Sequence, residues 1–117
     1  MKKIYHLGTC STCQRIIKSL ELGPDVILQD IKTDPITTAQ LDDMKKRSGS
    51  YESLFSRRAM KYRSMGLHER SLDEEEYRSL ILEEYTFLKR PVLILDDQIF
   101  VGNSKKVVAA AKQALNA

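Results

Sequence analysis

The sequence predicts an α/β fold with a mixed four-stranded sheet, built from a β-α-β half, a β-β-α half and helices inserted between them. Two apolar segments on either side of the first predicted helix are typical of parallel strands joined by a crossover. Two further apolar segments, separated only by Asp96-Asp97, predict a hairpin. A Cys-x-x-Cys pair lies where the first strand meets the first helix.

The chain of 117 residues is long enough for one domain with one core, and we expect a single domain over 1–117. No apolar run is long enough to cross a membrane, and Lys2-Lys3 precedes too short an apolar stretch for a secretory signal. We therefore expect a cytoplasmic protein without a membrane partner. The net charge of +3 is mild and does not favour direct binding to nucleic acid.

The β-α-β half is predicted over the first 31 residues. Gly8-Thr9 interrupts the first apolar segment, and Gly23-Pro24 ends the helix that follows it. The second strand is rich in β-branched residues. The expected elements are a strand over 3–7, a helix from residue 11 or 12, and a strand over 25–31.

The inserted helical region is predicted over about 36–88. Thr37 or Thr38 can cap its first helix, which should reach about Arg47. Ser71 and Glu74 have the spacing of a capping box, which places the start of another helix there. We expect a short helix over 51–55, a polar and basic connector through residue 67, and a helix from Ser71 to about 85.

The β-β-α half begins after Arg90-Pro91. Residues 92–95 and 98–101 form the two arms of the predicted hairpin. Gly102-Asn103-Ser104 breaks the second strand and caps a last helix over about 105–115. This order of elements is that of a thioredoxin-like fold, in which the hairpin makes the sheet mixed.

The cysteines of the chain are Cys10 and Cys13, which are too few for a disulfide framework or for the four ligands of a structural zinc site. At the N-terminus of a helix, unpaired N–H groups stabilise a thiolate, which is the reactive form of cysteine. We expect Cys10 to be the nucleophile and Cys13, about one turn on, the resolving thiol. Ser11 and Thr12 can donate hydroxyls to the site, and no metal is expected.

A second candidate group is Arg90-Pro91. In a thioredoxin-like fold, a cis proline at this position faces the cysteines and shapes the substrate groove. Arg90 would then lie at the mouth of the site, where its guanidinium can bind an oxyanion through two hydrogen bonds.

Together these residues resemble the ArsC/Spx family, a branch of the thioredoxin superfamily with a helical insertion. The resemblance covers nearly the whole chain. It is carried by Tyr5-His6, Cys10-Ser11-Thr12-Cys13-Gln14-Arg15, Arg57-Arg58 followed by Tyr62, Lys89-Arg90-Pro91-Val92, and Val101-Gly102.

Family members like arsenate reductase imply one set of roles. Their single catalytic cysteine corresponds to Cys10, and His6 is similar to a histidine of that group. Arg90 matches one of three assisting arginines, and Arg57 or Arg58 falls near a second. The third position, near Val101-Gly102-Asn103, carries no arginine. Glutathione with glutaredoxin completes the cycle in that group.

Members like Spx imply another role. They keep Cys-x-x-Cys as a redox switch and bind the C-terminal domain of the RNA polymerase α subunit. Cys13 favours this group, and the spacing of Gly49 and Arg57 is similar to a polymerase-contacting pair in Spx.

The resemblance therefore leads us to expect an arsenate reductase-like thiol-disulfide redox protein. Its substrate would be an oxyanion or a disulfide, bound by His6, Ser11, Thr12, Arg58, Arg90 and Pro91. Glutaredoxin or thioredoxin would restore the thiols, and no organic cofactor is implied. The alternative is an Spx-like regulator that uses Gly49 and Arg57 to bind its partner.

Overall fold

The computed structural model describes residues 1–117 and divides them into two compact units. The first unit joins Met1–Pro35 to Arg90–Ala117, and the second is the intervening segment Ile36–Lys89. No helix in the chain has both the length and the apolar character that a membrane crossing requires.

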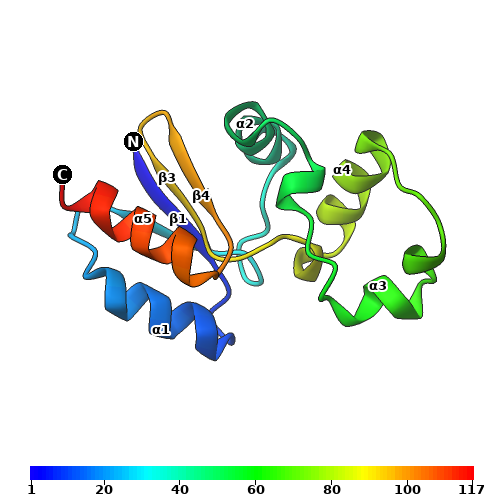
Figure 1. Ribbon diagram of the computed structural model, residues 1–117, viewed down its shortest axis with the longest axis horizontal. Coiled ribbons are helices and arrows are strands. Elements are labelled where there is room, and N and C mark those ends of the chain that lie inside the picture. Colours follow the sequence, from blue (N-terminus) through cyan, green and yellow to red (C-terminus); the bar gives the residue numbers. More distant parts are fainter. The chain divides into compact units, whose positions relative to one another are not determined.

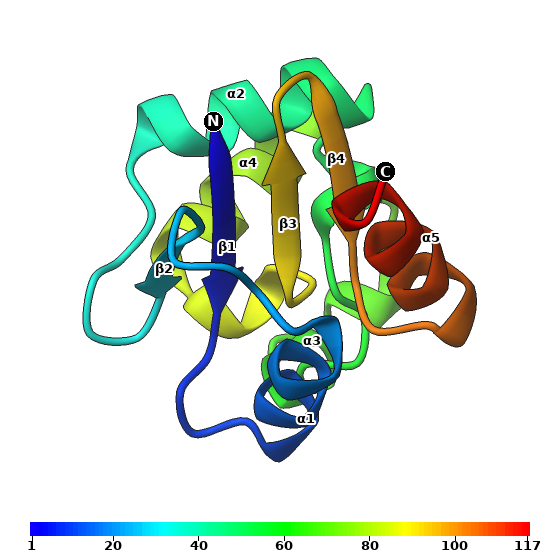
Figure 2. The same cartoon turned by 90° about the vertical axis from the view of Figure 1, so that its left-hand side faces the viewer.

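The sheet of the first unit has four strands in the order β2-β1-β3-β4. Strand β1 pairs in parallel with β2 and antiparallel with β3, and β3 forms a hairpin with β4. Figure 2 shows β1 and β3 in the middle of the sheet and the other two strands at its edges. The strands are β1 (Lys2–His6), β2 (Ile27–Asp30), β3 (Val92–Leu95) and β4 (Gln98–Val101). The predicted mixed sheet of the thioredoxin-like fold is confirmed.

Helices α1 (Ser11–Leu20) and α5 (Lys105–Leu115) lie side by side against one face of this sheet (Figure 1). Their apolar residues recur at helical spacing, so each helix presents one apolar stripe to the strands. Burial of each aliphatic side chain in this core contributes about 1.5–3 kcal/mol. The core side chains come from the central strands and both helices, and include Ile4, Ile16, Leu20, Leu93, Leu95 and Ala111.

The second unit consists of helices α2 (Thr38–Ser48), α3 (Met60–Ser64) and α4 (Glu74–Glu83) with three single 3₁₀ turns, at Glu52–Leu54, Leu67–Glu69 and Tyr85–Phe87. Its aromatic side chains gather around Phe55, which is fully buried. The Phe55 ring stacks on Phe87 at 5.0 Å and contacts Tyr77 at 4.9 Å between centroids. These contacts connect segments that lie more than twenty residues apart in the sequence.

Two local predictions in the inserted region are wrong. The residues expected to be a polar connector contain α3, and the helix expected to start at Ser71 is capped by Asp73 instead. The Asp73 carboxylate accepts a hydrogen bond from the Glu76 N–H at 2.9 Å, and the Glu76 carboxylate accepts one from the Asp73 N–H. The carboxylate of Glu74, which the predicted box required, accepts hydrogen bonds from the N–H groups of Tyr51 and Glu52.

Candidate active site

Cys10 is the N-cap residue of α1, and its thiol is free and partly exposed. A tight turn leads into it, because the Cys10 N–H donates to the Leu7 carbonyl at 3.0 Å. Its own carbonyl accepts the Gln14 N–H, the first hydrogen bond of the helix. The sulfur therefore lies beside the N–H groups of the first helical turn, which have no partner within the helix.

The pKa of Cys10 is lowered from its ordinary value. Partial burial of the thiol raises the pKa, but the opposing contributions are larger in sum. They come from the Cys13 and Thr12 N–H groups and the Cys13 thiol beside the sulfur, and from the positive charge of Arg90. This set of donors favours the thiolate and so makes Cys10 the more reactive sulfur.

Cys13 has the opposite character. Its side chain is fully buried, and this burial raises its pKa to about 11, with a further increase from the neighbouring Cys10 sulfur. A hydrogen bond from the Leu7 backbone and the charge of Arg90 act against the increase. The pair thus combines a partly exposed thiol of lowered pKa with a buried thiol that is protonated at neutral pH.

Arg90 and Pro91 lie in the first unit with the cysteines, and the peptide bond between them is cis. The Pro91 carbonyl accepts a hydrogen bond from the Gly102 N–H at 2.9 Å, which ties the start of β3 to the end of β4. Gly102 has φ of +94°, in the left-handed region that favours glycine. The guanidinium of Arg90 acts electrostatically on both sulfurs.

The loop before Cys10 contains contacts that the sequence did not reveal. Gln14 donates from Nε2 to the Leu7 carbonyl and also lies 3.2 Å from Nδ1 of His6. The Asp30 carboxylate accepts a hydrogen bond from the Lys32 N–H at 3.0 Å and a further one from the Gly8 N–H, and both lower its pKa. A Cβ on Gly8 would lie 2.4 Å from Oδ2 of Asp30, so a larger residue there would displace the Asp30 carboxylate.

Thr12 contributes to the site through its backbone N–H, whereas Ser11 is exposed at the first position of α1. The hydroxyl roles assigned to Ser11 and Thr12 stay predictions. The structure has no cluster of three or more His, Cys, Asp or Glu side chains placed to hold a metal ion. The thiols themselves are the redox groups that the geometry offers.

Comparison with known proteins places this arrangement in a family. The ArsC family model matches residues 5–111. The chain belongs to the ArsC family. No curated protein matches it.

Solved structures of similar proteins cover nearly all of this ArsC-family chain. A Brucella melitensis protein described as related to arsenate reductase is 29% identical, with a TM-score of 0.72 over 93% of this chain and 92% of its own. A Staphylococcus aureus protein is 25% identical, with a TM-score of 0.74 over 94% and 97%. The arsenate reductase of Vibrio cholerae is 17% identical, with a TM-score of 0.78 over 94% and 96%, and supports the fold alone.

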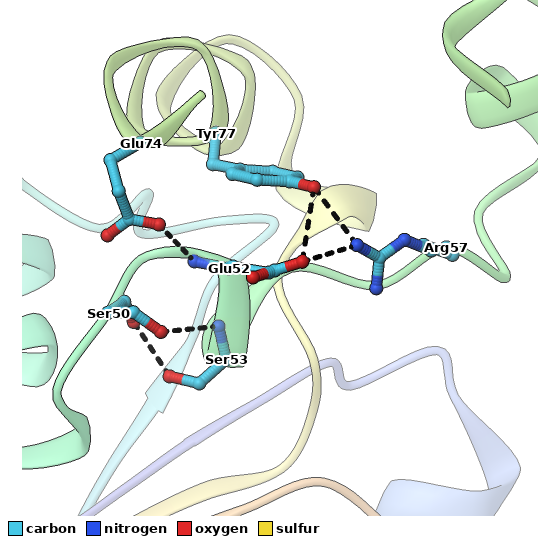
Figure 3. Close-up of polar contacts among 6 residues, drawn as sticks. All are labelled: Ser50, Glu52, Ser53, Arg57, Glu74 and Tyr77. Atoms are coloured by element: carbon cyan, nitrogen blue, oxygen red, sulfur yellow. Dashed lines mark hydrogen bonds and ion pairs between the residues drawn. The ribbon is translucent and has the colours of Figure 1, made fainter. Parts of the chain in front are cut away.

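The remaining candidate residues of this ArsC-family chain lie in the second unit. Arg57 donates from Nη2 to Glu52 at 2.8 Å and to the hydroxyl of Tyr77 at 3.0 Å, as Figure 3 shows. Arg58 is exposed and forms no ion pair. Gly49 ends α2 with φ of +100°, a helix cap that favours glycine. The local structure thus accounts for Gly49 and Arg57 without a partner.

Proposed function

We propose that this ArsC-family protein is an arsenate reductase-like thiol-disulfide oxidoreductase, with Cys10 as nucleophile and Cys13 as resolving thiol. The observation that carries the proposal is the difference between the two sulfurs. Cys10 is accessible at the start of α1 with a lowered pKa, whereas Cys13 is buried with its pKa raised to about 11. A nucleophile must be ionised and accessible, and a resolving thiol must be shielded until it is needed.

With a disulfide substrate, the Cys10 thiolate attacks one sulfur, a mixed disulfide forms and the first thiolate leaves. Cys13 then loses its proton and attacks the Cys10 sulfur, so that the second thiolate leaves and the Cys10–Cys13 disulfide forms. The protein gives up two electrons, which the substrate disulfide receives. With arsenate, Cys10 bonds to arsenic and displaces an oxygen as water. Attack by Cys13 on Cys10 then releases arsenite, and the same two electrons reduce As(V) to As(III).

The oxyanion would bind at the N-terminus of α1, where backbone N–H groups converge. Arg90 supplies a positive charge that already acts on both sulfurs. The proposed site also includes His6, Ser11, Thr12 and Pro91. The resemblance alone supports Arg58 as a further anion-binding candidate, and its side chain is exposed in the second unit. Glutathione with glutaredoxin, or thioredoxin, would reduce the Cys10–Cys13 disulfide after each cycle.

The test measures thiol loss on incubation of the reduced protein with arsenate or with a small disulfide. We expect both cysteines to be consumed, with loss of two hydrogens by mass spectrometry and complete loss of activity in Cys10→Ser. Cys13→Ser should stop after formation of the mixed disulfide. If wild-type protein forms no Cys10–Cys13 disulfide with either oxidant, the proposed function is wrong.

The alternative proposal is an Spx-like regulator, in which the same disulfide alters a contact with the C-terminal domain of the RNA polymerase α subunit. Its supporting feature is Cys13, since a catalytic cycle through glutaredoxin needs only Cys10. Co-purification with that domain, lost in Gly49→Arg, would favour the regulator. Arsenate-dependent thiol loss without such co-purification would favour the enzyme.

A further inference from the structure

The peptide group that joins Leu7 to Gly8 is held on both of its sides. Its carbonyl oxygen, which belongs to Leu7, accepts the Cys10 N–H at 3.0 Å and so closes the turn over Gly8 and Thr9. The peptide is trans and planar, so its N–H, which belongs to Gly8, points away from that carbonyl. Rotation of this one group would break the hydrogen bond that carries Cys10 to the start of α1.

Asp30, the last residue of β2, lies at the N–H side of the same peptide group. Its carboxylate accepts the Gly8 N–H. The geometry shows the same close approach, because a Cβ built on Gly8 would lie 2.4 Å from Oδ2 and 3.3 Å from Cγ of Asp30. The other oxygen, Oδ1, accepts the Lys32 N–H at 3.0 Å, which fixes the orientation of the carboxylate. One carboxylate thus joins the turn after β2 to the turn before Cys10.

The backbone pairing of β1 with β2 ends before the cysteine turn. Its last residue pair is His6 and Asp30, and the Ile31 N–H then donates to the His6 carbonyl at 2.9 Å. From Leu7 onward the chain leaves the sheet. The Asp30 side chain therefore makes the connection from β2 to this turn that the backbone of the two strands no longer makes.

We propose that Asp30 is a positioning residue for Cys10, because its carboxylate holds the Leu7–Gly8 peptide group and with it the turn that brings the thiol to the start of α1. The proposal rests on the proposed role of Cys10 as the nucleophile. The effect of Asp30 on the sulfur passes through Gly8. A charged acceptor makes this hydrogen bond stronger than a neutral one would.

The first experiment measures the pH dependence of Cys10 alkylation by iodoacetamide, with Cys13→Ser in every protein. Asp30→Asn keeps the shape of the side chain but leaves one oxygen for two N–H donors. We expect the midpoint to move to higher pH and the rate at neutral pH to fall about fivefold, the effect of one lost hydrogen bond. The direction separates positioning from charge, because removal of a nearby negative charge would by itself favour the thiolate and lower the midpoint. A role confined to the turn after β2 would lower the stability in urea and leave the midpoint in place.

Asp34→Asn is the matched control, because it removes the same charge from the same turn. Asp34 is exposed, and it contributes to the turn through its backbone N–H, which donates to the Asp30 carbonyl at 2.8 Å. We expect its midpoint and rate to equal those of the Cys13→Ser protein. The proposal is wrong if Asp30→Asn leaves the midpoint unchanged or lowers it, or if Asp34→Asn raises the midpoint equally.

Gly8→Ala tests the same contact from the other side. The φ of Gly8 lies outside the left-handed region, and the Asp30 carboxylate is the group that a Cβ there would meet. Gly8→Ala should therefore slow the alkylation of Cys10 about as much as Asp30→Asn does, about fivefold. In an Asp30→Ala background the same change should alter the rate by less than about twofold, because the two residues share one interaction. Equal slowing by Gly8→Ala in both backgrounds would contradict the proposal.

These measurements use proteins without the resolving thiol, so they do not depend on disulfide formation. If the protein with both cysteines forms no Cys10–Cys13 disulfide, the proposed function fails. The direction of the midpoint shift in Asp30→Asn decides the role of Asp30 in either case.

Discussion

Cys10 and Cys13 are three residues apart, yet their surroundings give them opposite acid–base character. Cys10 receives two backbone N–H groups at the start of α1, whereas Cys13 lies fully inside the core. Desolvation disfavours the charged form of a thiol, and hydrogen bonds to sulfur favour it. The opposite pKa shifts of the two sulfurs therefore follow from their positions in the first turn of α1.

Arg90 adds a positive charge beside both thiols. The variant Arg90→Met tests how much this charge affects the pKa of Cys10. The loss of this charge should raise the pKa of Cys10, because a nearby cation favours the thiolate. The pH dependence of Cys10 alkylation by iodoacetamide measures the shift. Both proteins, with Arg90 and with Arg90→Met, carry Cys13→Ser so that Cys10 is the only thiol that reacts. An unchanged midpoint would show that Arg90 has no electrostatic role at Cys10.

The raised pKa of Cys13 predicts a specific loss of stability in alkali. In the unfolded chain this thiol loses its proton near its ordinary value of 9.0, but in the folded protein only near 11. Between these pH values the unfolded state binds fewer protons, so the free energy of unfolding falls as pH rises. The loss should be on the order of 2 kcal/mol over this range. Urea unfolding of the reduced protein at each pH measures it, and Cys13→Ala should lack this part of the decline.

At the scale of elements, the segment before α4 contains two possible capping boxes, of which one forms. Ser71 and Glu74 have the right spacing, and so do Asp73 and Glu76. The second box forms, since the Glu74 carboxylate is used by the N–H groups of Tyr51 and Glu52. Glu74 thus joins α4 to the 3₁₀ turn at Glu52–Leu54, a contact visible in Figure 3.

Alanine substitution of Ser71 and of Asp73 shows which of the two residues caps α4. Asp73→Ala should reduce the free energy of unfolding by about 1 kcal/mol, because it removes the acceptor for the Glu76 N–H. Ser71→Ala should change it by less than about 0.5 kcal/mol. Chemical unfolding of both variants gives the comparison, and a larger effect at Ser71 would contradict the observed cap.

At the scale of the whole molecule, the chain contains two compact units, and folding as one domain over 1–117 stays a prediction. Phe55→Ala tests it. Loss of this fully buried ring from the aromatic cluster should destabilise the second unit by about 3–5 kcal/mol. If the chain is one cooperative domain, hydrogen exchange should also accelerate at the β3 amides of the first unit. Exchange that accelerates only within 36–89 would instead show two independently unfolding units.

The sequence predicted the outline of the molecule well where the signals are local. The two arms of the hairpin, the last helix with its Ser104 cap, and the Thr37 cap of α2 follow the prediction closely. Each depends on neighbouring residues alone: β-branched runs, a turn at Asp96-Asp97, or a hydroxyl before a helix. The position of Cys10 at the first strand-helix junction follows for the same reason.

By itself, then, the sequence determined the order of the elements apart from α3, the mixed sheet and the place of the cysteine pair, because apolar periodicity and chain-breaking residues act over a few positions. Only the tertiary structure decided which sulfur is buried, which box caps α4, and that Arg57 is held by Tyr77, twenty residues further along. It also brought Gln14, Leu7 and His6 into one cluster. These features depend on desolvation and on hydrogen bonds between segments that are distant in the sequence. A local sequence pattern does not show which of these segments come together.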